Sequence, residues 1–256
     1  MLLVIDVGNT NTVLGIYDGD RLAAYWRLTT ERQRTIDEYG IQFRNLLTLA
    51  GYDSAAISAV AISSVVPPLN YTLEKVSQLY LKQTPMFVDH ASDTGMTILY
   101  SPISDVGADR IVNSVAAIER YGAPCIIVDF GTATTFDAVT AAREYIGGVI
   151  TPGVIISAEA LFQRASRLSR VEIRRPEQII GQTTINSVQS GLYYGYIGMV
   201  DGILKRMLAE LGNHPRIIAT GGLARLIGRG SEYIEEIDDH LTLEGLRLIY
   251  ERNRPH

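Results

Sequence analysis

Short apolar runs separated by turn residues open the chain and predict three β-strands, at residues 2–7, 12–17 and 21–28. Asp18 and Gly19 separate the second run from the third, and a two-residue hairpin turn needs the positive backbone angles that glycine adopts easily. The first three elements are therefore expected to form an antiparallel meander.

A helical period replaces the strand pattern at residues 36–50, where apolar residues recur three and four positions apart. Thr35 and Glu38 have the spacing of a capping box at the start of this helix, and Gly51 is typical of a helix end. The elements expected next are a strand at 58–64, a helix after Pro67-Pro68, a short strand at 86–89 and a helix that begins near Asp109.

One pattern, an apolar strand that ends in an acid and a turn of small residues, occurs twice. The copies are LLVIDVGNTNT near the N-terminus and CIIVDFGTATT in the middle of the chain. A shift of 123 positions places Asp129 on Asp6 and Thr135 on Thr12. Both copies continue into a second apolar strand, which indicates that a whole structural unit is repeated.

A second pair of similar segments supports this duplication. AVAISSVVP at 59–67 and RIIATGGLA at 216–224 are both apolar strands that close in small residues and follow a helix. We therefore expect two related domains, residues 1–117 and residues 118–256, the second of which includes the closing helix.

The composition is that of an ordinary globular protein, with 46% hydrophobic and 20% charged residues, which excludes wholesale disorder. The net charge of −5 gives no general attraction for nucleic acid, so no nucleic-acid partner is expected. No apolar run approaches the ~18 residues that span a membrane, and the first run stops at Asp6, too soon for a signal peptide. With Cys125 as its one cysteine, the chain is expected to be cytoplasmic, without a membrane partner.

The residues that follow each repeated strand suit phosphate binding. An acid can orient a hydrated Mg²⁺, glycine allows close approach to the backbone, and turn N–H groups and threonine hydroxyls can donate to phosphate oxygens. For one copy alone, a plain hairpin turn is the simpler alternative, since glycine and asparagine tolerate turn geometry. Two copies, together with TGG at 220–222, favour phosphate binding over a plain turn. Two other nucleotide-binding motifs, the P-loop and GxGxxG, do not occur in the sequence.

A second candidate lies in YSPISDVGADR, residues 100–110, which leads into an amphipathic helix. Asp109 could cap this helix, a common role for aspartate in a first turn. It could instead be a general base that accepts the proton of a substrate hydroxyl as the hydroxyl attacks a phosphate. Arg110 could then pair with a substrate carboxylate. From these residues alone, capping is the simpler interpretation.

Two further clusters are given structural interpretations. A solvent-exposed face is expected for the arginines, which are Arg164, Arg167, Arg170, Arg174 and Arg175. Helix packing or a subunit interface is expected for Tyr193, Tyr194 and Tyr196, because the interleaved glycines Gly191, Gly195 and Gly198 allow close approach.

Taken in order, the motifs resemble those of type III pantothenate kinases, a family of the acetate and sugar kinase, heat-shock-70 and actin superfamily. The segments that carry the resemblance are DVGNTNT at 6–12, GADR at 107–110, DFGTATTFD at 129–137, GGVITPG at 147–153, TTINSVQSG at 183–191 and TGGLA at 220–224. It implies an α/β fold of two ribonuclease-H-like, actin-like ATPase domains with mixed sheets and a nucleotide cleft between them. One departure is Ser101-Pro102, where many members have Asn-Pro.

The resemblance also implies an activity, the ATP-dependent phosphorylation of pantothenate to 4′-phosphopantothenate, the first step of coenzyme A biosynthesis. The implied ATP contacts are Asp6, Val7, Gly8, Asn9, Thr10, Asn11, Thr12, Val13 and Thr132. The implied pantothenate contacts are Tyr100, Gly107, Ala108, Asp109, Arg110 and Thr184, with Asp109 as the catalytic base. Mg²⁺ is implied with ATP near Asp6, and a monovalent cation, K⁺ or NH₄⁺, is implied at Asp129.

The family resemblance further implies a homodimer whose pantothenate site lies near the subunit boundary. Three alternatives remain open from the sequence. The first is a kinase for another small hydroxyl substrate, the second is a non-catalytic nucleotide-binding regulatory protein, and the third is an actin-like filament or chaperone ATPase. Only the segment at 100–110 and Thr184 argue for pantothenate over another acceptor.

Overall fold

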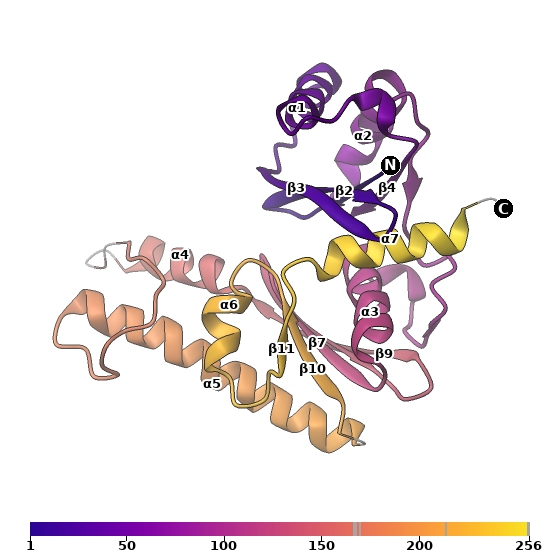
Figure 1. Ribbon diagram of the computed structural model, residues 1–256. Helices are drawn as coiled ribbons and strands as arrows, with labels where there is room; N and C mark the ends of the chain where they lie inside the picture. The colour runs from indigo at the N-terminus through magenta and orange to yellow at the C-terminus, as the bar shows by residue number, and fades with distance from the viewer. Residues whose placement is uncertain (166–167, 169, 213, 255–256) are drawn as a thin grey trace. The chain divides into compact units, whose positions relative to one another are not determined.

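The computed structural model describes residues 1–165, 168, 170–212 and 214–254 (Figure 1). The chain divides into two compact units, one made of Met1–Ala116 with Leu241–His256 and the other of Ala117–His240. The chain passes between them twice, once within the helix Ala108–Tyr121 and once at His240–Leu241.

The first unit is built around a mixed sheet with the strand order β3-β2-β1-β4-β5. Its strands are β1 (Leu2–Val7), β2 (Asn11–Asp18), β3 (Arg21–Thr29), β4 (Ala59–Ser64) and β5 (Met86–Phe87). Strands β1, β2 and β3 pair antiparallel, whereas β1 pairs with β4 and β4 with β5 in parallel. Outside the sheet lie η1 (Ser54–Ala56), β6 (Thr97–Ile98) and η2 (Ile103–Asp105).

The helices of this unit are α1 (Ile36–Leu49), α2 (Pro67–Tyr80), the first part of α3 (Ala108–Tyr121) and α7 (Leu241–Asn253). The predicted capping box of α1 is confirmed: the Thr35 amide donates to Glu38 Oε2 at 2.7 Å, and the Glu38 amide donates to Thr35 Oγ1 at 3.3 Å. The predicted hairpin is also confirmed, but Asp18 pairs with Arg21, so the two-residue turn is Gly19-Asp20 and not Asp18-Gly19; Gly19 has a φ of 62°. Local sequence patterns therefore account for these elements.

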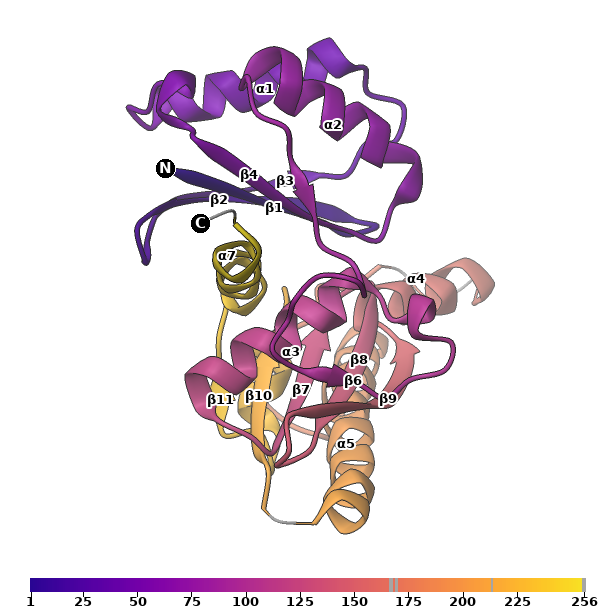
Figure 2. The ribbon, with the colours of Figure 1, turned by 90° about the vertical axis from the view of Figure 1, so that its right-hand side faces the viewer.

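Helices cover the first sheet on both faces. Figure 2 shows α1 and α2 on one face and α7 along the opposite face. The core between the sheet and the first two helices is apolar and includes Leu3, Ile5, Val7, Tyr39, Phe43, Leu47, Leu69, Leu73 and Val76. On the other face, Gly15 leaves room for the side chains of Val4 and Leu243, and the absence of a side chain at Gly245 lets α7 meet the Val112 backbone. Helix α7 thus groups with the first unit, whereas the expected boundaries counted it with the second half.

The second unit repeats the topology of the first. Its strands are β7 (Cys125–Phe130), β8 (Ala133–Val139), β9 (Glu144–Pro152), β10 (Arg216–Thr220) and β11 (Glu236–Ile237). They lie in the order β11-β10-β7-β8-β9, the same arrangement as β5-β4-β1-β2-β3. Strand β10 is parallel to β7 as β4 is to β1. The predicted internal duplication is therefore confirmed by strand order and direction.

The helices of the second unit are α4 (Val154–Arg164), α5 (Thr184–Leu211) and α6 (Ala224–Ile227), followed by η3 (Gly228–Gly230). Side chains of α5, among them Tyr193, Val200 and Leu204, form the core with Ile126 and Val128 of β7. Tyr194 and Tyr196 pack against this core, and the Tyr196 hydroxyl donates to the Gly153 carbonyl at 3.1 Å, so the predicted helix packing of the three tyrosines is confirmed.

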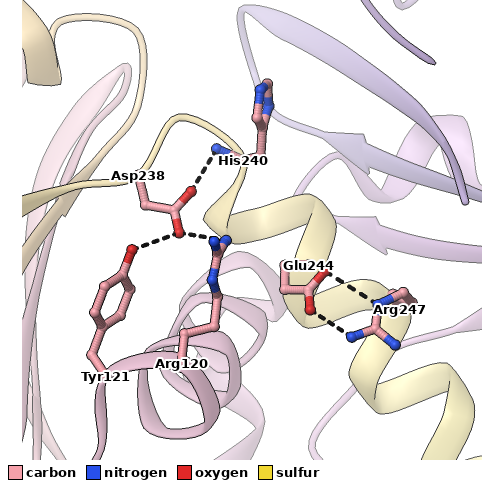
Figure 3. Close-up of polar contacts among 6 residues, drawn as sticks. All are labelled: Arg120, Tyr121, Asp238, His240, Glu244 and Arg247. Carbon is pink, nitrogen blue, oxygen red and sulfur yellow. Dashed lines mark hydrogen bonds and ion pairs between the residues drawn. The ribbon is translucent and has the colours of Figure 1, made fainter. Parts of the chain in front are cut away.

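The buried carboxylate of Asp238 joins two segments of the second unit (Figure 3). Asp238 Oδ2 accepts from the Tyr121 hydroxyl at 3.0 Å and from Arg120 Nη1 at 2.7 Å, and Asp238 Oδ1 accepts from the His240 amide at 3.0 Å. Burial and the Asp238 charge raise the pKa of Tyr121 to about 12. This cluster fixes the end of α3 against the segment that leads into α7.

In the first unit, Arg247 of α7 is nearly buried and lies between two carboxylates of the same helix, of which Figure 3 shows Glu244. It bonds Glu244 at 2.5 Å and Glu251 at 2.8 Å, and its guanidinium lies 5.6 Å from the centre of the Tyr17 ring. The bonds to Glu244 hold the pKa of Arg247 above its usual range. Within the described part of the chain, no helix has the length and apolar character to cross a membrane.

Candidate active site

The first repeated loop is a tight turn at the carboxyl end of β1. The Gly8 amide donates to the Asn11 carbonyl at 3.0 Å, which closes the turn directly after Asp6 and Val7. A Cβ at Gly8 would lie 3.1 Å from that carbonyl, so glycine allows the close approach. Asn9, Thr10 and Asn11 are exposed at the tip of the turn.

Residues that follow β3 hold this turn in place through hydrogen bonds. Thr30 Oγ1 donates to the Gly8 carbonyl at 2.7 Å and lies 2.9 Å from Thr12 Oγ1, and the Thr30 amide donates to the Thr10 carbonyl at 2.9 Å. Arg32 Nη2 donates to Asn9 Oδ1 at 2.8 Å. Thr12 is buried with its hydroxyl beside Thr30, so this predicted ATP contact lies inside the turn.

The second repeated loop is one residue shorter than the first. In the hairpin of β7 and β8 Phe130 pairs with Thr134, whereas in that of β1 and β2 Val7 pairs with Thr12. The structural counterpart of Thr12 is therefore Thr134, and the predicted match of Thr12 with Thr135 is wrong by one position. The shorter turn is closed by the Gly131 amide, which donates to the Ala133 carbonyl at 3.0 Å and leaves Thr132 exposed.

Asp129 of β7 lies against the loop that follows β10. It pairs with Thr220, and the next residue, Gly221, has a φ of 93°. A Cβ at Gly221 would lie 2.4 Å from Asp129 Oδ1 and 2.7 Å from the Phe130 amide nitrogen. The lack of a side chain at Gly221 thus lets this loop pack directly against the Asp129 carboxylate and the Phe130 backbone.

Asp109 lies in the first turn of α3 with its side chain half-buried. Its Oδ1 accepts from the Arg110 amide at 2.8 Å, so the carboxylate does contact the helix end, as the capping interpretation required. Burial raises the pKa of Asp109, opposed by the hydrogen bond from the Arg110 backbone and by the Arg110 charge. A carboxyl group with a raised pKa is a stronger proton acceptor when ionised.

A short chain of contacts places Asp109 at the same edge of the first sheet as the first loop. The Val65 amide donates to the Val7 carbonyl at 3.0 Å. Val65 Cγ1 would lie 3.5 Å from a Cβ at Gly107, and Asp109 Oδ1 would lie 2.5 Å from it. The structure therefore brings the predicted loop at 6–13 and the predicted segment at 107–110 together within one unit.

The remaining predicted substrate contacts lie elsewhere in the chain. Tyr100 belongs to the first unit and is 36% exposed. Thr184 begins α5 in the second unit and is exposed, next to Thr183, whose hydroxyl caps the helix by accepting from the Asn186 amide at 3.2 Å. Arg164, Arg170, Arg174 and Arg175 are exposed as predicted, and Arg167 lies outside the described residues.

The sequence did not identify two polar residues beside the first loop. Thr30 directly follows β3, and nothing in its local sequence marks it. Ser63 lies on β4 directly opposite Asp6, and the parallel pairing of β1 with β4 that would have shown this was not predicted. Strand neighbours such as these follow from topology rather than from a motif.

A metal ion held by the protein alone has no support in the described part of the chain, which contains no group of three or more His, Cys, Asp or Glu side chains placed to hold one. Mg²⁺ commonly binds through one or two carboxylates with water and substrate phosphates. The single carboxylate of Asp6, followed by an exposed turn, fits that second kind of site.

Comparison with known proteins adds independent information. A family model for type III pantothenate kinase matches residues 2–206. A type III pantothenate kinase of Anaeromyxobacter sp. (strain Fw109-5) is 59% identical over 254 residues, covering 99% of this chain and 100% of that protein. A type III pantothenate kinase of Geobacter sulfurreducens is also 59% identical over 254 residues, with the same coverage.

Among solved structures, component A of (R)-2-hydroxyglutaryl-CoA dehydratase from Acidaminococcus fermentans superposes with a TM-score of 0.56. The alignment covers 99% of both chains at 13% identity, so it bears on the fold alone. Together with the two mixed sheets, this likeness confirms the predicted α/β fold.

Proposed function

The chain belongs to the type III pantothenate kinase family, and on that premise we propose how its own residues phosphorylate pantothenate with ATP. The product is 4′-phosphopantothenate, and the reaction is the first step of coenzyme A biosynthesis. The observation that carries the mechanism is the position of Asp109, half-buried at the edge of the sheet that also presents the first loop.

Asp109 is the catalytic base in this proposal. Its carboxylate accepts the proton of the primary hydroxyl while the hydroxyl oxygen forms a bond to the γ-phosphorus of ATP. The bond from that phosphorus to the bridging oxygen breaks, and ADP leaves with the electron pair. Burial raises the pKa of Asp109, which strengthens it as a proton acceptor.

The two loops hold the phosphates of ATP. Asn9, Thr10 and Asn11 of the first loop and Thr132 of the second are exposed residues of tight turns, and their backbone N–H groups and side chains would donate to the phosphate oxygens. Preorganised donors of this kind stabilise negative charge as it spreads over the transferred group. Val7, Gly8, Thr12 and Val13 contribute through the shape of the turn.

Two carboxylates are proposed to hold the cations. Asp6 would hold Mg²⁺ together with ATP, and Asp129, against which the Gly221 loop packs, would hold K⁺ or NH₄⁺. Bound there, the cations would neutralise phosphate charge. The residues fit this task because each acid is the second-last residue of a strand that leads into a glycine turn, where backbone and ligand oxygens can complete a coordination shell.

Pantothenate is proposed to bind along the segment that precedes α3. The Arg110 side chain is 7% exposed, so its charge is poorly screened and can pair strongly with the substrate carboxylate. Gly107 and Ala108 shape the wall next to Asp109, and Tyr100 and Thr184 supply further polar contacts. The segment 100–110 is thus the part of the chain that selects the acceptor.

A homodimer through the α4–α5 face belongs to the same proposal. A Cβ at Gly191, Gly195 or Gly198 would meet no described atom within 4 Å, so one side of α5 is open. Large apolar side chains are exposed on the same unit: Ile155, Ile156, Leu161, Ile179, Ile180 and Ile185. A pocket of about 740 Å³ beside Thr184 is lined partly by Leu161, Val188 and Leu192. A second copy covering this face would bury it and approach Thr184.

A cytoplasmic location completes the proposal. Cys125 is a free, buried thiol whose pKa burial raises to about 12, so it is a core residue and not a reactive group. The substrate ATP and the coenzyme A precursor are both small intracellular anions, which agrees with local binding sites on an acidic protein.

An acceptor panel tests the proposed function. ADP release is measured with Mg²⁺ and K⁺ in the presence of pantothenate, acetate, glucose or no acceptor. We expect release that depends on pantothenate. Preference for another acceptor would assign the chain to a different small-molecule kinase, release without any acceptor would indicate an ATPase, and nucleotide binding without turnover would indicate a regulatory protein.

A further inference from the structure

Ser63 is a fully buried serine whose hydroxyl is not used by the fold. Its side chain is 0% exposed, and Ser63 Oγ has no hydrogen-bond partner among the residues that the structure describes. A buried hydroxyl without a partner destabilises a folded protein, whereas an alanine of nearly the same shape would not. The hydroxyl therefore needs an explanation other than folding.

Other serines nearby show how the fold satisfies such groups. Ser64 Oγ accepts from the Val66 amide at 3.2 Å, where the chain turns into α2. The buried hydroxyls of Ser77 and Ser114 each donate to a carbonyl one helical turn earlier, at 2.8 Å in both cases. Ser63 differs from all three, although it is as deeply buried as Ser77 and Ser114.

The position of Ser63 indicates what the hydroxyl is for. In the parallel ladder of β1 and β4, Ser63 is paired directly with Asp6. Paired residues on neighbouring strands point to the same face of a sheet, and the strands are about 4.8 Å apart, so a serine hydroxyl can reach the neighbouring carboxylate. The second unit repeats the arrangement, with Thr220 paired with Asp129.

We propose that Ser63 is a positioning residue for Asp6: its hydroxyl donates a hydrogen bond to the Asp6 carboxylate when that carboxylate turns toward a Mg²⁺-nucleotide complex. The inference rests on the proposed function, in which Asp6 faces the metal. The bond would hold one carboxylate oxygen in place and leave the other directed at the cation and its water shell.

The test compares Ser63→Ala with Ser64→Ala, a matched control that removes the neighbouring hydroxyl. Melting temperature is measured without ligand, and the affinity for Mg²⁺ with a non-hydrolysable ATP analogue is measured by calorimetry. For Ser63→Ala we expect a melting temperature equal to or above that of the wild type, and affinity for the Mg²⁺-nucleotide reduced by roughly 10–100-fold. For Ser64→Ala we expect a lower melting temperature with unchanged affinity.

A double-mutant cycle with Asp6→Asn identifies the partner. If Ser63 acts through Asp6, adding Ser63→Ala to Asp6→Asn changes the affinity for the Mg²⁺-nucleotide little further. A Ser63→Ala protein with wild-type affinity, or one that loses affinity equally in both backgrounds, would overturn the inference. A wild-type protein that binds no Mg²⁺-nucleotide would instead contradict the proposed function, so the two failures are distinguishable.

Discussion

Asp109 and Gly107 share one small space at the start of α3. A Cβ on residue 107 would lie 2.5 Å from Asp109 Oδ1, closer than non-bonded atoms approach, so the carboxylate occupies the room that the glycine leaves. Because a carboxylate at the end of a short side chain can move, a side chain at 107 would displace the base and need not unfold the helix.

Gly107→Ala should therefore lower kcat with little change in stability. A displacement on the order of 1 Å at a reacting group can cost about 10²-fold in rate. The measurement is kcat for pantothenate phosphorylation together with thermal unfolding. Gly202→Ala in α5, where a Cβ would come no closer than 3.6 Å to its nearest neighbour, serves as the control. Equal kcat values for Gly107→Ala and the wild type would contradict the placement of Asp109.

Asp109→Asn should remove the base and lower kcat by roughly 10²–10⁴-fold. The base works when ionised, and burial raises its pKa, so kcat/KM of the wild type should fall with decreasing pH at a higher pH than an ordinary aspartate would give. A pH profile of kcat/KM checks this. The fall of kcat/KM at low pH should be absent in Asp109→Asn. If the variant shows the same fall, the titrating group is not Asp109.

The same pKa shift predicts that Asp109→Asn, which lowers kcat, does not lower the stability of the folded protein. A carboxyl group with a raised folded-state pKa favours the folded state below its unfolded pKa, and this contribution is lost as pH rises through the folded pKa. At pH values above its folded-state pKa, the ionised Asp109 thus opposes folding. Asp109→Asn should consequently melt at or above the wild-type temperature at pH 7, and a clear decrease would show that Asp109 is needed as a cap.

Asp129→Asn should weaken the response to monovalent cations. The wild type should be much more active in K⁺ than in Na⁺, because the proposed site beside Gly221 is shaped by one carboxylate and a close backbone. The variant should lose activity by roughly the 10–100-fold typical of disturbed cation sites, and the difference between K⁺ and Na⁺ should shrink. Equal wild-type activity in K⁺ and in Na⁺ would contradict the proposal that Asp129 is a cation ligand.

Asp238→Asn should destabilise the second unit. The buried carboxylate accepts from Arg120, Tyr121 and the His240 amide, and the neutral amide keeps the shape but loses the charge (Figure 3). A loss of about 1–3 kcal/mol in the free energy of unfolding is expected, measured by denaturant titration. Asp239→Asn is the control, because its ion pair with Arg225 is largely exposed and should contribute little.

Local patterns predicted the elements of the chain well, for physical reasons. The capping box of Thr35 and Glu38 and the hairpin turn at Gly19 act over a few residues, so composition and spacing are sufficient to identify them to within one position. The duplication was visible because both copies end a strand in the same acid. Its register was not, since a hairpin can lose one residue without changing its sequence pattern, as Phe130 and Thr134 show.

Contacts between neighbouring strands, and between segments far apart in the sequence, could not be predicted from local patterns. Helix α7 packs on the first unit because its apolar face fits against Gly15 and Val112, which are far away in sequence. The pairing of Ser63 with Asp6 depends on a parallel crossover, and the support that Thr30 gives to Gly8 depends on the meander. Asp109 could be proposed from the family motif, but its close contact with Gly107 depends on the backbone path at the start of α3, which no motif shows.

The central claim is that this chain transfers a phosphoryl group from ATP to the primary hydroxyl of pantothenate, with Asp109 as the base. Identification of the product by phosphorus NMR and mass spectrometry, for the wild type and for Asp109→Asn in parallel, tests it most directly. The account predicts 4′-phosphopantothenate in equal amount to ADP from the wild type, and nearly none from the variant in the same time. ADP without phosphorylated pantothenate, or equal product from both proteins, would contradict it.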